Sequence, residues 1–303
     1  MMFIIAEIGS NFDTLDDCLI SIREAKRVGA DACKFQLFSS EELYGFLEGR
    51  EMEYAMPRSW IPTLAKYADE VGIEFMCTAF SVEGLRYIDP YVKRHKIASS
   101  DMEYYPLLDV ARETGKPLII STGGHNNLEI SAVVKEFRGY DATFLYCESS
   151  YPANNIDLHK LSFFVDRGVP FGLSDHSREI YSNPFMALRT GCSVLEKHAN
   201  FCAAEGPDSP HSLDVYEFGK MVEALRGKGS TELYSGEEAD MRLRHNRRPV
   251  AKRDIAYGEL LQYEVNFGLY RLLDDRADTL LCSSYKTLEN TPATKAYKAG
   301  DPI

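Results

Sequence analysis

The sequence predicts a closed parallel (β/α)8 barrel, the TIM-barrel class, followed by a small β-rich module. Eight short β-branched and aromatic segments alternate with amphipathic segments of helical periodicity. This alternation takes about 225 residues, a length typical of the fold. A doubly wound open sheet is the alternative, but no glycine-rich dinucleotide turn follows the first predicted strand.

The predicted elements follow one another regularly along the chain. The strands are expected over 3–8, 32–38, 74–80, 95–99, 117–122, 143–147, 170–174 and 193–198. Helices between them include 16–28, 59–71 and 184–190, which end near Gly29, Gly72 and Gly191. We therefore expect a barrel over 1–228, a linker over 229–246 and a C-terminal module over 247–303.

The C-terminal module contains a weak internal repeat. Segments 250–261 and 293–303 share an apolar run, a glycine and an acid, and Gly258 aligns with Gly300. Since so small a module buries little apolar surface, we expect it to pack on a barrel.

Charge and cysteine usage exclude several classes of protein. The chain has 34 Lys and Arg against 46 Asp and Glu, a net charge of −12 that repels nucleic acid and anionic membranes. No apolar run approaches the roughly 18 residues of a membrane span, and the opening apolar run is too short for a signal peptide. Seven scattered cysteines without a CxxC pair indicate reduced thiols. We expect a cytoplasmic protein.

Polar residues occur at the end of every predicted strand. They are Glu7, Lys34 and Gln36, Thr78, Lys96 and Ser99, Ser121 and Thr122, Ser149 to Tyr151, Ser174 to His176, and Glu196 to His198. Because the carboxyl ends of barrel strands build the active site, these side chains are candidates for chemistry.

Lys34 and Lys96 lie within otherwise apolar strands, where an unpaired ammonium is costly to bury. Internal ion pairs with Glu7 or Glu196 are one interpretation, and a Schiff-base lysine is another. The two lysines together with neighbouring hydroxyls favour a phosphate or carboxylate ligand. Those hydroxyls belong to Thr78, Ser99 and Ser121.

His176 and His198 end the seventh and eighth strands, so their imidazoles can converge on one ion. Two histidines with nearby oxygen donors suit a divalent first-row metal with open positions. Asp175 and Glu196 are expected to orient the metal ligands or a water molecule next to the ion. Four further histidines show no comparable pairing: His95, His125, His159 and His211. Of these, His125 and His211 are expected to be solvated loop residues.

Taken together, these segments resemble the sialic acid synthase family. The matching segments are AEIG at 6–9, GADACKFQLF at 29–38, CTAF at 77–80, KIASSD at 96–101, PLIISTGG at 117–124, GLSDHS at 172–177, EKH at 196–198, and GPD with SL at 206–213. They cover nearly the whole predicted barrel in order. The region from residue 248 onward resembles, more weakly, the family's antifreeze-protein-like (SAF) domain in a shortened form.

The resemblance implies condensation of phosphoenolpyruvate with an N-acetylated amino sugar, N-acetylmannosamine or a 6-deoxy diacetamido sugar, to give a nonulosonate and phosphate. It implies that Lys34, Lys96, Ser99, Ser121 and Thr78 bind phosphoenolpyruvate. Residues facing the sugar or the catalytic water would be Glu7, Gln36, Tyr151 and Glu196. Further substrate-binding residues would be Ser150, Ser174 and Asp175.

The resemblance also implies a cofactor and a partner subunit. His176 and His198 would hold Mn2+, with Mg2+ or Co2+ as alternatives. In the family, the antifreeze-like domain of one subunit covers the barrel of its dimer partner and supplies an arginine, which Arg271 matches. A domain-swapped homodimer is therefore expected.

The chain differs from the family's pattern at three places. The family's Asn before Tyr-Pro is Ser150, its His after Gly-Pro-Asp is Ser209, and the Pro-Gly after its capping arginine is Leu272-Leu273. These differences lie where the sugar is recognised or the capping domain closes. Two alternatives to the synthase stay open: a lysine-dependent aldolase and a non-catalytic relative that binds a sugar or a phosphate.

Overall fold

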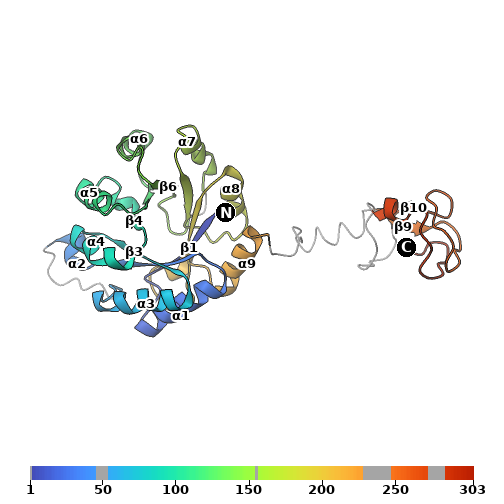
Figure 1. Ribbon diagram of the computed structural model, residues 1–303, viewed down its shortest axis with the longest axis horizontal. Helices are drawn as coiled ribbons and strands as arrows, with labels where there is room; N and C mark the ends of the chain where they lie inside the picture. Colours follow the sequence, from blue (N-terminus) through green and yellow to red (C-terminus); the bar gives the residue numbers. More distant parts are fainter. Residues whose placement is uncertain (1, 46–53, 154–155, 228–246, 272–283) are drawn as a thin grey trace. The chain divides into compact units, whose positions relative to one another are not determined.

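The structure is a computed structural model that describes residues 2–45, 54–153, 156–227, 247–271 and 284–303 (Figure 1). The chain divides into two compact units, Met1–Gly229 and Ser230–Ile303. The predicted linker, 229–246, lies outside the described residues.

The first unit is a closed barrel of eight parallel strands, each hydrogen-bonded to its neighbours in sequence order, with β8 against β1. The strands are β1 Phe3–Gly9, β2 Ala32–Leu37, β3 Glu74–Ala79, β4 His95–Ile97, β5 Leu118–Ser121, β6 Ala142–Tyr146, β7 Phe171–Asp175 and β8 Val194–His198. The predicted (β/α)8 barrel is confirmed, and the open-sheet alternative is wrong.

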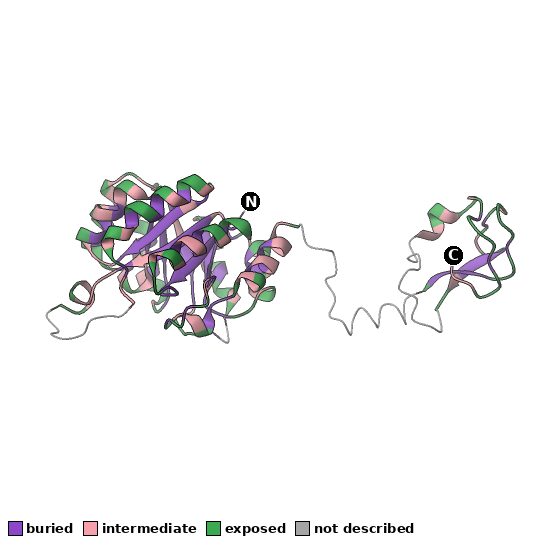
Figure 2. Ribbon diagram, turned by 90° about the horizontal axis from the view of Figure 1, so that it is seen from below, coloured by how far each residue is buried: buried purple, intermediate pink, exposed green. Residues whose placement is uncertain are grey.

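Helices surround the strands, with buried faces toward the sheet and exposed faces outward (Figure 2). They are α1 Leu15–Arg27, α2 Ser40–Tyr44, α3 Ile61–Val71, α4 Val82–Ile88, α5 Tyr105–Glu113, α6 Asn127–Glu136, α7 Ser162–Val165, α8 Ser182–Thr190 and α9 Val215–Leu225, with short 3-10 turns η1 Arg58–Trp60, η2 Asp89–Tyr91, η3 Ser99–Asp101, η4 Leu158–Leu161 and η5 Ser209–His211. None of the helices in the described ranges has both the length and the apolar character needed to cross a membrane.

Local sequence signals set several helix ends. Thr14 and Asp17 form a capping box at the start of α1, where each side chain accepts a hydrogen bond from the backbone of the other. Gly72 and Gly191 end α3 and α8 with φ values of 74° and 95°, a left-handed conformation that glycine adopts without a steric penalty. These helix ends lie within two residues of their predicted positions.

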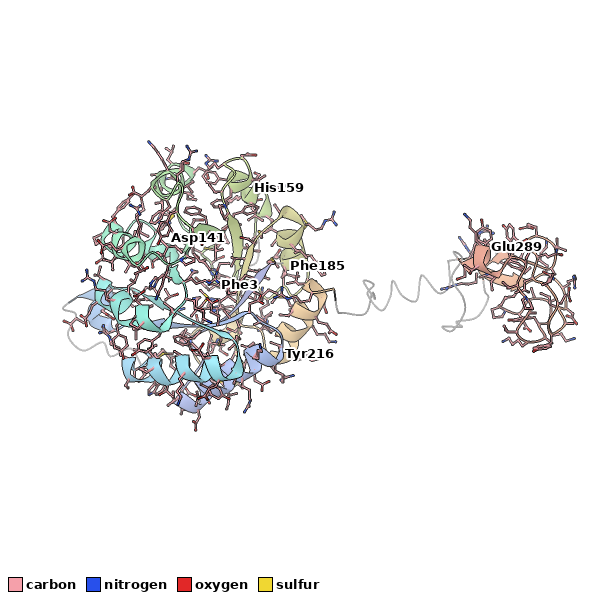
Figure 3. All side chains as sticks on the ribbon, viewed as in Figure 1. Phe3, Asp141, His159, Phe185, Tyr216 and Glu289 are labelled. Atoms are coloured by element: carbon pink, nitrogen blue, oxygen red, sulfur yellow. The ribbon has the colours of Figure 1, made fainter. Side chains whose placement is uncertain are left out.

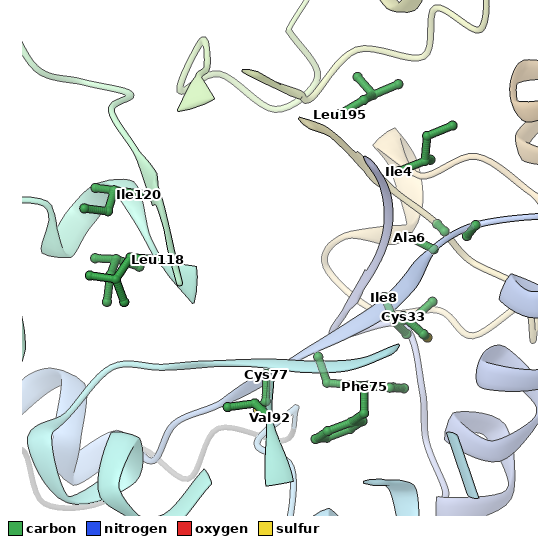
Figure 4. Packing of buried hydrophobic residues seen from close by; sticks show 14 of the residues in the cluster. Ile4, Ala6, Ile8, Cys33, Phe75, Cys77, Val92, Leu118, Ile120 and Leu195 are labelled. Carbon is green, nitrogen blue, oxygen red and sulfur yellow. The ribbon is translucent and has the colours of Figure 1, made fainter. Parts of the chain in front are cut away.

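Strand alternation separates two hydrophobic layers. Outward-facing residues such as Ile4, Ala6 and Ile8 of β1 pack under the helices (Figure 4). A second cluster fills the barrel interior and consists of Ile5, Ala32, Met76, Ile119, Leu145 and Val194. Because Glu7 lies two residues after Ile5, its carboxylate faces the interior at the carboxyl end of the barrel.

The register of the strands brings the predicted site residues to one level. Glu7 is aligned with Lys34 of β2 on one side and with His198 of β8 on the other. Thr78 is aligned with Lys96, and Ser174 is aligned with Glu196. Parallel pairing therefore converts residues far apart in sequence into neighbours around one opening.

Replacing Gly172 with alanine is expected to destabilise the barrel by about 3 kcal/mol, because overpacking a strand position forces the backbone to shift. A Cβ at Gly172 would lie 2.3 Å from the backbone oxygen of Val194 and 2.7 Å from Cδ2 of Leu145. Urea unfolding measures the change. Gly219→Ala on α9 is the control, since its Cβ would make only ordinary contacts of 3.4 Å or more with Val28. Equal stability of the two variants would contradict this packing argument.

The second unit contains an antiparallel pair, β9 Arg248–Ala251 and β10 Phe267–Tyr270, and a short helix, α11 Tyr285–Leu288. Its core consists of Ala251, Ile255, Leu261, Phe267, Ala293, Tyr297 and Ile303. The two repeat segments pair with each other through bridges that include Ile255 to Tyr297. Gly258 and Gly300, aligned in the predicted repeat, both have positive φ, 78° and 92°.

Candidate active site

A cavity of about 540 Å³ opens at the carboxyl ends of the barrel strands. Ligand sites of this fold lie at the same end. Most of the predicted site residues of the barrel line the cavity, whereas Thr122, Ser150, Asp175 and Lys197 do not. Those that line it include Glu7, Lys34, Gln36, Thr78, Lys96, Ser99, Ser121, Tyr151, Ser174, His176, Glu196 and His198.

Lys34 is 2% exposed and bound to oxygen atoms on two sides. Its Nζ lies 2.5 Å from Oε2 of Glu7 and donates a hydrogen bond to Oγ1 of Thr78 over 3.1 Å. Burial disfavours the ammonium, but the carboxylates of Glu196 and Glu7 outweigh burial and raise the pKa of Lys34 above its usual value. Lys34 is therefore a fixed positive charge and is poorly suited to be a nucleophile.

Lys96 has a different environment. Its Nζ donates to Oγ of Ser121 over 2.8 Å and to the carbonyl oxygen of Ile97 over 3.1 Å, while Glu196 lies 3.7 Å away. Burial lowers the pKa of Lys96, and the attraction of Glu196 offsets this only in part. Lys96 therefore has fewer anionic partners than Lys34 and is open to an added anion.

Two carboxylates lie between the lysines and the histidines. Glu196 accepts a hydrogen bond from Oγ of Ser174 over 2.9 Å and lies 3.7 Å from both Lys34 and Lys96. Burial opposes its charge, but the two lysines prevail and lower the pKa of Glu196 to about 2. Burial raises the pKa of Glu7, although Lys34 opposes this, and Nε2 of Gln36 donates to Oε1 of Glu7 over 2.7 Å.

His176 and His198 lie side by side, with ring centroids 5.5 Å apart. Nδ1 of His176 donates to the carbonyl oxygen of Glu148 over 2.8 Å, so Nε2 carries the lone pair. The hydroxyls of Ser174 and Tyr151 lie 3.3 and 3.5 Å from this Nε2. Tyr151 stacks on the His176 ring at 4.3 Å. Burial lowers the pKa of His176 and lowers that of His198 to about 3. Both rings are neutral at neutral pH, the form that binds metals.

The prediction of solvated loop histidines is wrong for His211 and His125. His211 is 4% exposed and lies against His198, with ring centroids 4.6 Å apart. The loop after β8 folds back because the backbone N–H of Leu213 donates to the carbonyl oxygen of His198 over 3.0 Å. His125 is partly buried and lines the cavity. His159 is exposed and lies near the edge of the barrel (Figure 3).

Asp208 also lines the cavity, although the sequence analysis marks it only as part of the GPD segment at 206–208. Its Oδ2 accepts hydrogen bonds from the backbone N–H of Ser10 over 2.9 Å and from the hydroxyl of Ser10 over 2.8 Å. Burial favours the neutral acid, but His211, His198 and Ser10 hold the pKa of Asp208 below its usual value. The spacing of Asp208 and His211, three residues apart, is the sequence signal that could have indicated this pair.

Gly123 lines the cavity next to Ser99. The backbone N–H of Gly123 donates to Oγ of Ser99 over 3.0 Å. A Cβ at Gly123 would lie 2.3 Å from Oγ of Ser149 and 2.5 Å from Sγ of Cys147. Only glycine fits at this position, so the backbone of residue 123 lies close to Ser99, whose hydroxyl is predicted to bind an anion.

Asp175 and Ser150 are predicted site residues of the barrel that do not line the cavity. Strand alternation turns Asp175 to the outside of the barrel, where it is fully buried and its Oδ2 lies 2.8 Å from Nζ of Lys197. Ser150 is exposed and does not line the cavity. Arg271 is an exposed residue of the second unit, and the neighbouring Leu272-Leu273 lies outside the described residues.

Replacing Lys197 with methionine is expected to lower the free energy of unfolding by about 3–5 kcal/mol, since it leaves the buried carboxylate of Asp175 without its cation. Lys197 also donates to the carbonyl oxygen of Ser177 over 2.6 Å, next to His176. Urea unfolding measures the loss. The double variant Lys197→Met/Asp175→Leu should recover most of it, because it removes both charges; a double variant as unstable as the single one would refute the ion-pair explanation.

Comparison with known proteins gives three results. Residues 21–232 match the model of the NeuB family. A pseudaminic acid synthase of Campylobacter jejuni is 30% identical, over 100% of this chain and 95% of its own. An uncharacterized protein of Methanocaldococcus jannaschii is 35% identical, over 86% of this chain and 82% of its own.

Solved structures agree with these sequence comparisons. The crystal structure of an N-acetylneuraminic acid synthetase from Leptospira borgpetersenii, in complex with citrate, is similar with a TM-score of 0.69 and 30% identity. The match covers 80% of this chain and 91% of that chain.

Proposed function

The chain belongs to the NeuB family and is a sialic-acid-type synthase, and from this premise we propose that it condenses phosphoenolpyruvate with an N-acetylated amino sugar in a metal-dependent reaction. The products would be a nonulosonate and phosphate. The observation that carries the proposal is one cavity holding two buried lysines, two buried carboxylates and a pair of neutral imidazoles.

Phosphoenolpyruvate would bind between Lys96 and the hydroxyl side of the cavity. Lys96 and Lys34 supply positive charge, and Ser99, Ser121 and Thr78 supply hydroxyl donors. Such donors suit both the phosphate and the carboxylate of the substrate. Lys34 keeps its contacts with Glu7 and Thr78. Lys96 would interact more strongly with phosphoenolpyruvate than Lys34 does, because Glu196 is its only anionic neighbour within 4 Å among the described residues.

The charges and the nitrogen donors of the cavity fit a divalent cation. The carboxylates of Glu7, Glu196 and Asp208 outnumber the two lysines among the described residues that line it, and the substrate adds further negative charge. Nδ1 of His198 is buried without a hydrogen-bond partner. We propose that His176 and His198 hold the ion, Mn2+ by the family resemblance, which supplies Lewis-acid polarisation of the acceptor's carbonyl oxygen when bound.

The remaining work falls to residues of the chain. Holding the two substrates in one cavity places C3 of phosphoenolpyruvate against the aldehyde carbon of the open-chain sugar, and orientation of this kind can lower a barrier by about 7–11 kcal/mol. As the new C–C bond forms, water adds to C2, and phosphate then leaves by C–O cleavage. Glu7 or Glu196 would accept the proton of that water. Gln36, Tyr151 and Ser174 would face the sugar.

A panel of acceptor sugars tests the proposal. N-acetylmannosamine and 6-deoxy diacetamido sugars are each supplied with phosphoenolpyruvate and Mn2+, and phosphate release is followed. We expect release that requires one sugar and is lost with a chelator, and we expect 18O in the bridging position of phosphoenolpyruvate to appear in the phosphate. If no sugar of either type supports release, the proposed reaction is wrong.

We further propose that the C-terminal module, 247–303, is an antifreeze-like capping domain that covers the barrel of a dimer partner and presents Arg271 there. The family resemblance supports this arrangement. Light scattering is expected to give a dimer mass, and Arg271→Ala is expected to raise the KM for substrate.

The cysteines in the described residues are free, which supports a reducing cytoplasmic location.

A lysine-dependent aldolase is the second candidate, because the pKa of Lys96 is lowered, as a Schiff-base lysine requires. Borohydride with pyruvate would then trap an adduct on Lys96. Under the synthase proposal no adduct forms, so mass spectrometry after reduction separates the two reactions.

A further inference from the structure

His211 and Asp208 lie in the loop after β8, and of the two only the charge of Asp208 enters the proposal above. His198 and His211 are 6% and 4% exposed, so both imidazoles are removed from bulk water. Ligand atoms of His198, Asp208 and His211 all lie within 4.8 Å of one another. Each side chain therefore offers a donor atom to the same small space.

Two ring nitrogens of this cluster, which could ligate a metal ion, make no hydrogen bond. Nδ1 of His198 and Nε2 of His211 are both buried and have no hydrogen-bond partner. Nε2 of His211 lies 3.5 Å from Oδ1 of Asp208, whereas Oδ2 of the same carboxylate is occupied by Ser10. A buried polar atom without a partner costs free energy, and a metal ion would provide partners for these atoms.

The backbone holds this arrangement in place. Asp208 lies over Gly9, where a Cβ would be 2.2 Å from its Oδ2, and the φ of Gly9 is +58°. At the other end of the loop, Nδ2 of Asn11 donates to Oγ of Ser212 over 2.7 Å. The loop that carries Asp208 and His211 is thus fixed to the segment after β1.

We propose that His211 and Asp208 are further ligands of the divalent metal ion that His198 and His176 hold, so that a carboxylate and a third imidazole complete the histidine pair. Such a set leaves positions open for substrate oxygens and suits first-row divalent ions. His176, whose Nδ1 is fixed by Glu148, faces the same cavity beside His198. The inference rests on the proposed function only for the reaction that the ion would serve.

Metal affinity tests the assignment without any sugar substrate. Calorimetry with Mn2+ and the metal-free full chain is compared for wild type, His211→Phe and Asp208→Asn. Phenylalanine keeps the ring contact with His198 and removes the nitrogen, and asparagine keeps an oxygen for Ser10. We expect each variant to bind Mn2+ at least tenfold more weakly. His159→Phe, which changes an exposed histidine, is the matched control and should bind like wild type.

Electron spin echo modulation of bound Mn2+ gives a second readout, because each ligating imidazole nitrogen contributes to the signal. His211→Phe should lose one contribution and His159→Phe none. His211→Gln, a smaller polar change, replaces the phenylalanine variant if the latter does not fold. Wild-type affinity and an unchanged spin echo in the His211 variants would overturn the assignment, as would a wild-type protein that binds no Mn2+.

The acceptor panel and the affinity measurement fail separately. Tight Mn2+ binding that depends on His211, with no sugar supporting phosphate release, would keep the metal site and refute the synthase reaction. Metal-dependent release with an unaffected affinity in His211→Phe would keep the reaction and refute the ligand assignment.

Discussion

Lys96→Met is expected to lower kcat/KM for phosphoenolpyruvate by about 10²–10³-fold, the loss typical of removing one preorganised donor from a water-excluded site. Lys96 is 4% exposed and already holds Ser121 in place through a 2.8 Å hydrogen bond. Methionine keeps the length of the side chain and removes its charge. Steady-state phosphate release at varied phosphoenolpyruvate concentration measures the effect.

Two controls separate chemistry from folding in this variant. Lys66→Met changes a lysine whose side chain is 79% exposed on α3, and it should leave kcat/KM unchanged. Circular dichroism and thermal unfolding of Lys96→Met show whether the barrel persists, since Glu196 loses one of its two cations. A folded Lys96→Met enzyme with wild-type kcat/KM would show that Lys96 does not bind the anionic substrate.

His198→Ala is expected to reduce phosphate release by about 10³-fold or more, and millimolar Mn2+ should not restore it. His198 lies at the centre of the proposed metal site, next to His176, His211 and Glu7 in space. Loss of this ligand removes the Lewis acid that polarises the acceptor. Phosphate release and the thermal stabilisation produced by Mn2+ are measured together.

One result for His198→Ala would contradict the proposed role of the metal ion in the reaction. Wild-type phosphate release with a lost Mn2+ stabilisation would mean that the ion serves stability and not the reaction. His159→Ala is the matched control, because this histidine is exposed near the edge of the barrel (Figure 3). It should leave both measurements unchanged.

Much of the fold follows from local pattern. Each barrel strand was predicted to within two residues at each end, because β-branched segments bounded by capped amphipathic helices form a periodic signal. Ser99 is an exception to the strand assignments: it begins the 3-10 turn η3 Ser99–Asp101 after β4. The change is small because the hydroxyl still reaches the cavity.

Most of the candidate site also follows from position, since a residue at the carboxyl end of a barrel strand must face the same opening when alternation turns it inward. The same rule explains why the prediction of Asp175 as a site residue is wrong. Asp175 lies between Ser174 and His176, and the residue between two inward-facing positions points out of the barrel, where Asp175 binds Lys197. Alternation was available in the sequence, but the partner of Asp175 was not.

The order of strands and helices, the lysines at strand ends and the histidine pair were determined by the sequence itself, because periodicity and parallel pairing are local rules that repeat around a barrel. The burial of His211 and the recruitment of Asp208 were decided only in the tertiary structure. They depend on a loop that folds back along β8 and is held by Ser10 and Asn11, residues about 200 positions earlier in the chain. No periodic signal reports contacts of that kind, since they arise from how loops close over a completed barrel.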